Sequence, residues 1–220
     1  MTAIKKSTIS FLEMLKINNN REWFHANKSM YQDARENYES VVGDILEELT
    51  GFEPILKGLE VKNCVFRINR DTRFSHDKSP YKTNFGAFIV RGGKKNSDRF
   101  PGYYIHVEPG AGMLAGGSYQ PPSPWLAAIR EKIDEEPESI RKITSDREFI
   151  KYFGSIQGEK LVKAPKGYPA DHPDIELLKH KSFHVVHMVS DKMILSENFT
   201  DYTVEVFSAM KPFNDFLSDC

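Results

Sequence analysis

The sequence predicts an α+β fold: an antiparallel meander sheet of about five strands, with an N-terminal helical arm and C-terminal helices packed on one face. Helical periodicity fills the first 50 residues, strand alternation with short links follows, and helical periodicity returns from residue 122 with one further strand. No linker or repeat interrupts this order. We therefore expect one domain over residues 1–220, made of a helical arm (1–50), a sheet (62–120) and helices plus one strand (122–220).

The composition is that of an ordinary globular protein, with 40% hydrophobic and 28% charged residues and a net charge of −1. This balance excludes a protein that coats nucleic acid through its overall field, so any such binding must be local. Cys64 and Cys220 are too few for a disulfide framework or a zinc knuckle. Glu13 and Lys16 stand where a signal peptide would be apolar, and no run is long enough to span a membrane. We expect a cytoplasmic protein with no membrane partner.

Two helical patterns predict the arm. The first ends in the asparagine run 18–20, because Asn tolerates the left-handed conformation that follows a helix. Asn20 then opens a second segment, and a long helix continues to about Thr50. We expect Trp23 and Phe24, which precede the long helix, to pack in the core. Apolar residues of the long helix recur on one face: Tyr31, Ala34, Tyr38, Val41, Val42, Ile45 and Leu49.

Strand periodicity begins at Cys64, and five segments carry it: 64–70, 81–90, 102–109, 113–119 and 182–189. In the first segment we expect Cys64, Phe66 and Ile68 on one face and Val65, Arg67 and Asn69 on the other. In the third we expect Tyr103, Ile105 and Val107 to point inward and Tyr104, His106 and Glu108 outward. Glycines lack side chains, so we expect Gly86 and Gly116 to leave the polar face of the sheet open.

The C-terminal part is predicted to be helical apart from its one strand. Helices are expected from Ser123, over 138–143 and over 146–153, followed by an irregular connection at 157–173 that is rich in proline and glycine. Ser196 opens a final helix, which Pro212 could interrupt.

A strongly basic stretch lies at the start of the predicted sheet. Between Lys62 and Lys95 the chain has nine Lys and Arg residues but only two acids, Asp71 and Asp77, for a net charge of +7. The rest of the chain therefore carries −8. So polarised a segment indicates a surface that faces an anion.

Pairing of the first two strands across the loop 71–80 would bring Arg67 and Asn69 beside Lys82 and Asn84. Guanidinium and amide donors held on rigid strands are suited to phosphate or carboxylate. The opposing interpretation is a structural network, in which the arginines pair with nearby acids, namely Asp71, Asp77 and Glu108. Because the cations outnumber the acids, we favour the anion site. The predicted ligand-binding residues are Arg67, Asn69, Arg70, Arg73, Lys78, Lys82, Asn84 and Tyr104.

His106 and Glu108 are two residues apart on a strand and therefore share a face. They are the predicted catalytic residues, with His106 as general base and Glu108 as the group that orients it. They could instead be two metal ligands, with a third from His76, Asp77, His184 or His187, but such pairs are weak signals and we predict no metal site. No phosphate-binding glycine loop or nucleophile elbow is present, and the sequence specifies no cofactor.

Four motifs together resemble a known family. They are N-N-N-R-E-W-F-H-A-N-K, F-R-I-N-R-D-T-R-F-S-H-D-K-S-P-Y-K-T-N-F-G-A-F, Y-Y-I-H-V-E-P-G and L-A-G-G-S-Y. The chain is similar over nearly its full length to the bacterial and fungal family catalogued as domain of unknown function 2461. This resemblance implies a single domain, and it supplies no activity, substrate or site residue.

These observations lead to three hypotheses about function. The first is a protein that binds, and as an enzyme would also transform, a phosphorylated or nucleotide-like anionic small molecule at the basic strand-loop-strand segment. The second is a binding module for short single-stranded nucleic acid, with Phe74 or Tyr81 stacking on bases. The third is a protein-interaction domain whose loop docks an acidic partner. The sequence leaves enzyme activity, cofactor and oligomeric state open.

Overall fold

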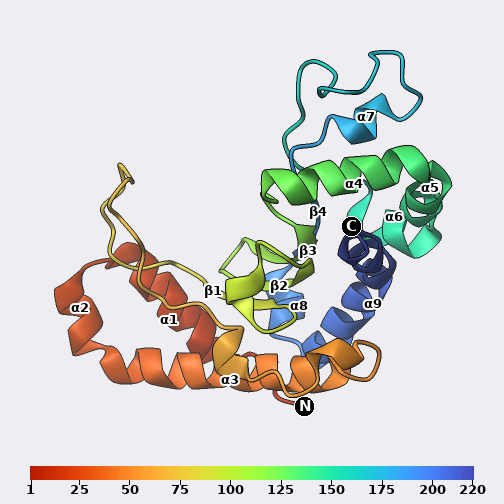
Figure 1. Cartoon of the computed structure of the whole chain (residues 1–220). Coiled ribbons are helices and arrows are strands. Elements are labelled where there is room, and N and C mark those ends of the chain that lie inside the picture. Colours follow the sequence, from red (N-terminus) through yellow and green to blue (C-terminus); the bar gives the residue numbers. More distant parts are fainter.

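The computed structural model describes all 220 residues and has the expected α+β architecture, with one antiparallel sheet and helices at both ends of the chain (Figure 1). The helices are α1 (Lys6–Ile17), α2 (Arg21–Ala26), α3 (Lys28–Leu49), α4 (Ser123–Glu135), α5 (Pro137–Ser145), α6 (Arg147–Phe153), α7 (Ile175–Leu178), α8 (Asp191–Ile194) and α9 (Phe199–Ser218). Three short 3₁₀ turns, η1 (Pro54–Leu56), η2 (Val61–Asn63) and η3 (Lys94–Asn96), complete the helical elements. None of the helices is both long and apolar enough to cross a bilayer.

The sheet has four strands rather than five, in the order β1-β2-β3-β4, and every neighbouring pair is antiparallel. The strands are β1 (Phe85–Ile89), β2 (Gly102–Val107), β3 (Gly112–Ser118) and β4 (Phe183–Val189). Chain order and spatial order agree, so this is the predicted meander, with α4 to α7 inserted between its last two strands. The inward positions of β2 are confirmed, since Tyr103, Ile105 and Val107 are buried.

The segment 64–70 was predicted to be a strand, and this is wrong. It meets the chain before and within β1 only through isolated bridges, Val65 to Ala87 and Asn69 to Tyr81. Between these two points three residues, 83–85, face the single residue Arg67, so the ladder is interrupted by a bulge. The predicted alternation fails there as well, because Val65 is buried beside Cys64 instead of facing outward.

The N-terminal arm follows the predicted pattern. Asn20 caps α2 by accepting a hydrogen bond from the backbone N–H of Trp23. The apolar face of α3 packs against α1, α9 and the sheet. Phe24 is buried and its ring stacks on Tyr81 at a centroid distance of 3.9 Å, while Trp23 packs partly buried against the same core.

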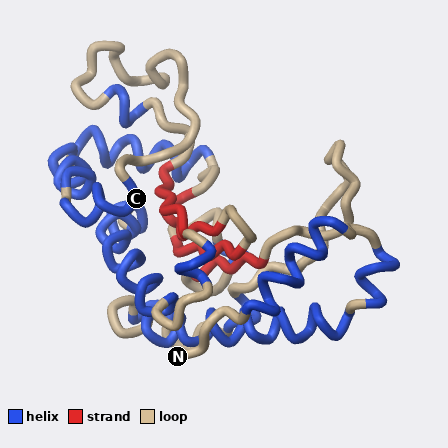
Figure 2. The backbone as a smooth tube through the Cα atoms, turned by 180° about the vertical axis from the view of Figure 1, so that it is seen from behind, coloured by secondary structure: helices blue, strands red, loops and turns tan.

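Helices cover only one face of the sheet. α3, α6 and α9 pack against this face. The view from behind shows the strands between the N-terminal helices, α1 to α3, and the C-terminal helices (Figure 2). Gly116 makes the approach of α9 possible, because a Cβ atom there would lie 2.1 Å from the sulfur of Met210. The prediction that Gly116 keeps the polar face open by lacking a side chain is therefore wrong, since a side chain there would point to the helix-covered face.

The C-terminal helix is continuous. It begins at Phe199, three residues later than expected, and includes Pro212 without interruption. The buried side chains of α9 join those of the arm and the sheet in one connected hydrophobic cluster.

We expect Gly116→Ala to lower the free energy of unfolding by about 1–3 kcal/mol, because the added methyl group has no space between Met210 and the Gly102 carbonyl. Gly43 in α3 is the matched control. A Cβ there meets only Val61 at 3.6 Å, so Gly43→Ala should raise stability by about 0.5–1 kcal/mol through the better helix propensity of Ala. Urea denaturation of the two variants measures both effects, and equal effects would contradict this account of the α9 contact.

Candidate functional site

The loop between residues 70 and 80 projects away from the helices beside α1 as a finger, visible in both overall views (Figures 1 and 2). Much of its charge is neutralised within it. Arg73 pairs with Asp71 at 2.6 Å, Arg70 pairs with Asp77, and Lys78 donates to a backbone carbonyl of the same loop. The alternative interpretation, a structural network of arginines paired with nearby acids, is thus present in part. Arg73 and Lys78 line neither of the two hollows beside the finger.

A polar hollow of about 330 Å³ lies at the base of the finger, next to the end of α1. It brings together three of the predicted ligand-binding residues, Arg70, Lys82 and Asn84. Sequence reasoning missed Lys16, which also lines it. The full lining is Lys16, Asn19, Arg70, Asp77, Ser79, Tyr81, Lys82, Thr83 and Asn84.

Asn19 fixes the backbone beside this hollow. Its side-chain amide donates to the Tyr81 carbonyl at 3.0 Å and accepts from the Tyr81 N–H at 3.1 Å, as a neighbouring strand would. The asparagine run had been interpreted only as the end of a helix. Its second role is to hold the chain that presents Lys82.

The open face of the sheet forms a second hollow, a groove of about 560 Å³. Strand register places four of its residues directly opposite one another in one row across the sheet: Phe88, Tyr104, Ala115 and Val186. Its other lining residues are Phe66, Lys82, Ser97, Met113, Gly116, Gly117, Tyr119 and His184. Gly86 gives Tyr104 its space, since a Cβ there would lie 2.8 Å from the tyrosine hydroxyl.

Lys82 lines both hollows and has no acidic partner. Its ammonium nitrogen lies over the Phe66 ring, 5.2 Å from the centroid. Burial, and secondarily the charge of Arg67, lower the pKa of Lys82. Arg67 is exposed and forms no ion pair either. Like Asn69, which is also exposed, it lines neither hollow. Lys82 and Arg67 are therefore neighbouring cations of the segment without an acidic partner. Arg91, Lys94 and Lys95 also form no ion pair, but they line neither hollow.

Tyr104, His106 and Glu108 form a hydrogen-bonded chain. The His106 Nε2 lies 2.9 Å from a Glu108 oxygen, and its Nδ1 lies 3.0 Å from the Tyr104 hydroxyl. An ionised carboxylate only accepts, so Nε2 carries the hydrogen, and in the tautomer with an unprotonated Nδ1 the Tyr104 hydroxyl donates to that nitrogen. Thr83 donates to the other Glu108 oxygen at 2.7 Å. The predicted pairing of His106 with Glu108 is present in this geometry.

The surroundings of Tyr104 and Glu108 determine the protonation states of both groups in this hydrogen-bonded chain. Burial, together with the nearby Glu108, raises the pKa of Tyr104 to about 12, so the phenol is neutral at pH 7. Burial alone would raise the pKa of Glu108, but hydrogen bonds from Thr83 and His106 outweigh it and the pKa is lowered. Glu108 is therefore an ionised acceptor, and it orients His106 as a carboxylate orients a catalytic histidine.

The imidazole stands between the two hollows. Tyr104 lines the groove, and Asn84 lines the polar hollow with its amide 3.3 Å from the same His106 Nδ1. The Tyr104 hydroxyl therefore connects the imidazole to the groove, while His106 itself lines neither hollow.

The residues considered as a third metal ligand lie in different places. His187 is on the helix-covered side, where it bonds the Tyr202 hydroxyl and the Tyr152 carbonyl. His184 lines the groove and lies directly opposite Gly117 in the pairing of β3 with β4. No three His, Cys, Asp or Glu side chains come together in the protein.

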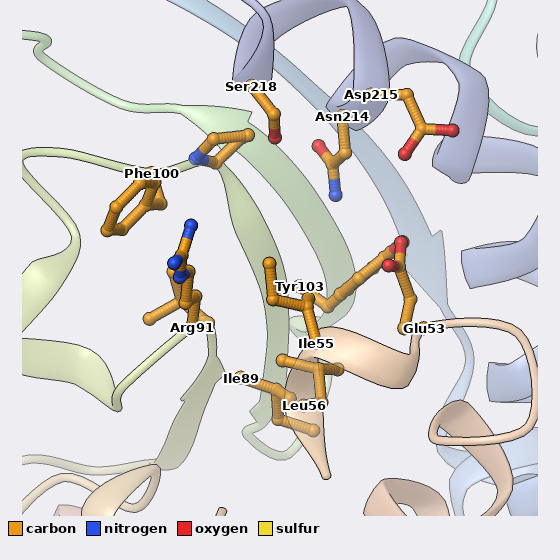
Figure 3. A pocket seen from close by; sticks show the side chains of 12 residues that line it. Glu53, Ile55, Leu56, Ile89, Arg91, Phe100, Tyr103, Asn214, Asp215 and Ser218 are labelled. Atoms are coloured by element: carbon orange, nitrogen blue, oxygen red, sulfur yellow. The ribbon is translucent and has the colours of Figure 1, made fainter.

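A smaller cavity of about 90 Å³ lies between α9, η1 and the edge of the sheet (Figure 3). There Tyr103 donates to Glu53 at 2.5 Å, and the buried Asn214 has an amide oxygen with no partner. The space is enough for about three water molecules. It is too small for the ligands considered below.

We expect the carboxylate of Glu108 to stabilise the fold in a pH-dependent way. Its pKa is lowered on folding from the usual 4.5, so its contribution is present above that value and is lost as pH falls through the folded pKa. At about pH 7 the Glu108→Gln variant should be less stable by about 1–2 kcal/mol, and the difference should shrink towards about pH 3. Urea denaturation at both pH values measures it.

Glu13 is exposed and forms no ion pair, so Glu13→Gln is the control and should change little at either pH. A difference between wild type and Glu108→Gln that grows on acidification would contradict the hydrogen-bond assignment.

Comparison with known proteins identifies one family. Its sequence profile, described as conserved hypothetical protein DUF2461, matches residues 7–216. No curated protein and no solved structure matches the chain. The match covers nearly the whole chain, including the arm, the sheet and α9. The chain belongs to the DUF2461 family of conserved hypothetical proteins.

Proposed function

We propose that the protein binds an anionic small molecule, phosphorylated or nucleotide-like, with its anionic group against Lys82. The observation that carries this proposal is a half-buried lysine, positioned between two hollows, that has no acidic partner. Withdrawing an ammonium group from water costs free energy unless a counter-charge compensates it. A bound anion supplies that counter-charge and reverses the lowering of the Lys82 pKa.

The groups around Lys82 are suited to the same ligand. Lys16 and Arg67 form no ion pair, and Arg70 retains guanidinium donors beyond its contact with Asp77. Asn84 adds an amide at the edge of the polar hollow. Donors of this kind, gathered near Lys82, recognise phosphate or carboxylate oxygens.

We further propose that the site transforms its ligand by proton transfer. A ligand O–H or N–H bonded to the Tyr104 oxygen passes its proton there, while Tyr104 passes its own proton to His106 Nδ1. The resulting imidazolium is paired with Glu108, whose ionised state supports this step. In this scheme Tyr104 touches the ligand and His106 receives the proton.

One observation favours a second candidate, the binding of short single-stranded nucleic acid. Phe74 on the finger is 93% exposed, with the Arg73 guanidinium 5.8 Å from its ring centre, which is a stacking arrangement for bases. Tyr81, the other expected stacking residue, is buried against Phe24 and cannot serve. The internal ion pairs of the finger weaken this candidate, and they equally weaken the docking of an acidic protein partner.

We expect inorganic phosphate, pyrophosphate or nucleotides to raise the melting temperature of the wild type. Lys82→Ala should lower the affinity for the best of these at least about tenfold, because a charge-assisted contact is lost. Lys95→Ala removes an exposed lysine outside both hollows and should leave affinity unchanged. Thermal shift screening followed by isothermal titration calorimetry measures these effects. Absence of binding to every anion, or equal losses in the two variants, would overturn the proposal.

A further inference from the structure

We infer that the ligand has a flat aromatic ring at its uncharged end, and that this ring lies in the groove while a single phosphate lies at Lys82. The ligand class is thus an aromatic phosphate, of which a nucleoside monophosphate is the simplest example. This inference rests on the proposed function, since it places the anionic group at the same lysine. Its own basis is the composition and layout of the groove.

The groove is apolar and rich in rings. Lys82 is the only lining residue with a permanent charge, and the others include Phe66, Phe88, Tyr104 and Tyr119. Aromatic faces attract flat rings through stacking, and each such contact also removes apolar surface from water. Tyr119 is 69% exposed at the rim, where a stacked ligand would cover it.

The floor of the groove has the shape that a flat ring needs. In the row across the sheet, the small side chains of Ala115 and Val186 follow the larger Phe88 and Tyr104. On one side of this row Gly102 and Gly117 pair with each other, so β2 and β3 contribute no side chain of their own there, and the Phe88 ring lies against Gly102. A ring can therefore lie over Ala115 and close to the backbone of Gly117 in β3.

His184 offers a polar group beyond this floor. It is opposite Gly117, its ring meets Tyr119 edge-on at 5.2 Å, and Ser182 lies 3.3 Å from its Nδ1. Burial lowers the pKa of His184, so at pH 7 the imidazole is neutral. A neutral imidazole can donate to or accept from the polar edge of a heteroaromatic ring.

Size and charge separate this ligand from a nucleic-acid strand. The groove and the polar hollow share Lys82, and their volumes are in the range of small-molecule sites. A nucleic-acid strand carries a phosphate at every nucleotide and is tracked by a line of cations. Beyond Lys82 the groove has no cation to meet a second phosphate.

The test compares two kinds of ligand that both carry a single phosphate, with and without an aromatic ring. Calorimetry with adenosine, guanosine, cytidine and uridine 5′-monophosphates and with ribose 5-phosphate should give at least one nucleotide that binds about fivefold or more tightly than the sugar phosphate. Tyr119→Ala should remove most of this difference and leave the affinity for ribose 5-phosphate unchanged. Phe74→Ala removes an even more exposed aromatic residue outside the groove and should change neither affinity.

A further groove variant, Ala115→Leu, fills the floor of the groove. It should lower the affinity for nucleotides and leave the affinity for ribose 5-phosphate unchanged. The melting temperature of each variant verifies that it is folded. Equal affinities for nucleotides and ribose 5-phosphate would overturn the ring inference and leave the anion site standing. Failure of all these phosphates to bind would overturn both proposals. An oligonucleotide that binds far more tightly, with the gain lost in Phe74→Ala, would overturn the inference in favour of nucleic acid.

Discussion

The contact between α9 and β3 decides which face of the sheet is covered. Gly116 lets Met210 approach the backbone, so the C-terminal helix lies directly on the strand, and Asn214 of the same helix donates to the Gly102 carbonyl. The long helix of the arm packs against α9 and the same side of the sheet. The helices that pack on the sheet, α3, α6 and α9, thus leave its opposite face uncovered. Its row of Phe88, Tyr104, Ala115 and Val186 therefore borders an open groove instead of a second core layer.

The bulge opposite Arg67 has a comparable effect on the polar residues. A regular ladder would have sent alternate side chains of 81–90 to alternate faces. Instead, the three residues 83–85 lie opposite the single residue Arg67. Thr83 can therefore reach Glu108, and Asn84 can reach His106, from the same short stretch. Bulges commonly redirect side chains in this way beside functional sites. The bulge that removes one predicted strand thus also brings together the polar side chains between the two hollows, beside Lys82.

Local patterns predicted much of this protein, and contacts distant in sequence account for what they missed. The helices of the arm and the pairing of His106 with Glu108 follow from periodicity alone. Lys16 could not be placed, because 66 positions separate it from Lys82 and no pattern links a helix end to a strand. The net charge of the segment 62–95 was correctly counted, yet charge counting does not reveal that Arg70 and Arg73 are paired with acids of the finger. Gly116 was assigned to the wrong face because a glycine in a strand pattern has no side chain to indicate its direction.

The magnitude of Coulomb interactions explains why few of the nine basic residues would matter for binding. Two unit charges 4 Å apart interact by about 1 kcal/mol in water and by about 4 kcal/mol at the effective dielectric near a protein surface. Arg73 is solvated and already neutralised by Asp71, so an anion gains little from it. Lys82 is half-buried, unpaired and flanked by Arg67, so the same anion gains several times more there. The affinity of this protein for an anion should therefore depend more on the surroundings of Lys82 than on the total charge of the segment 62–95.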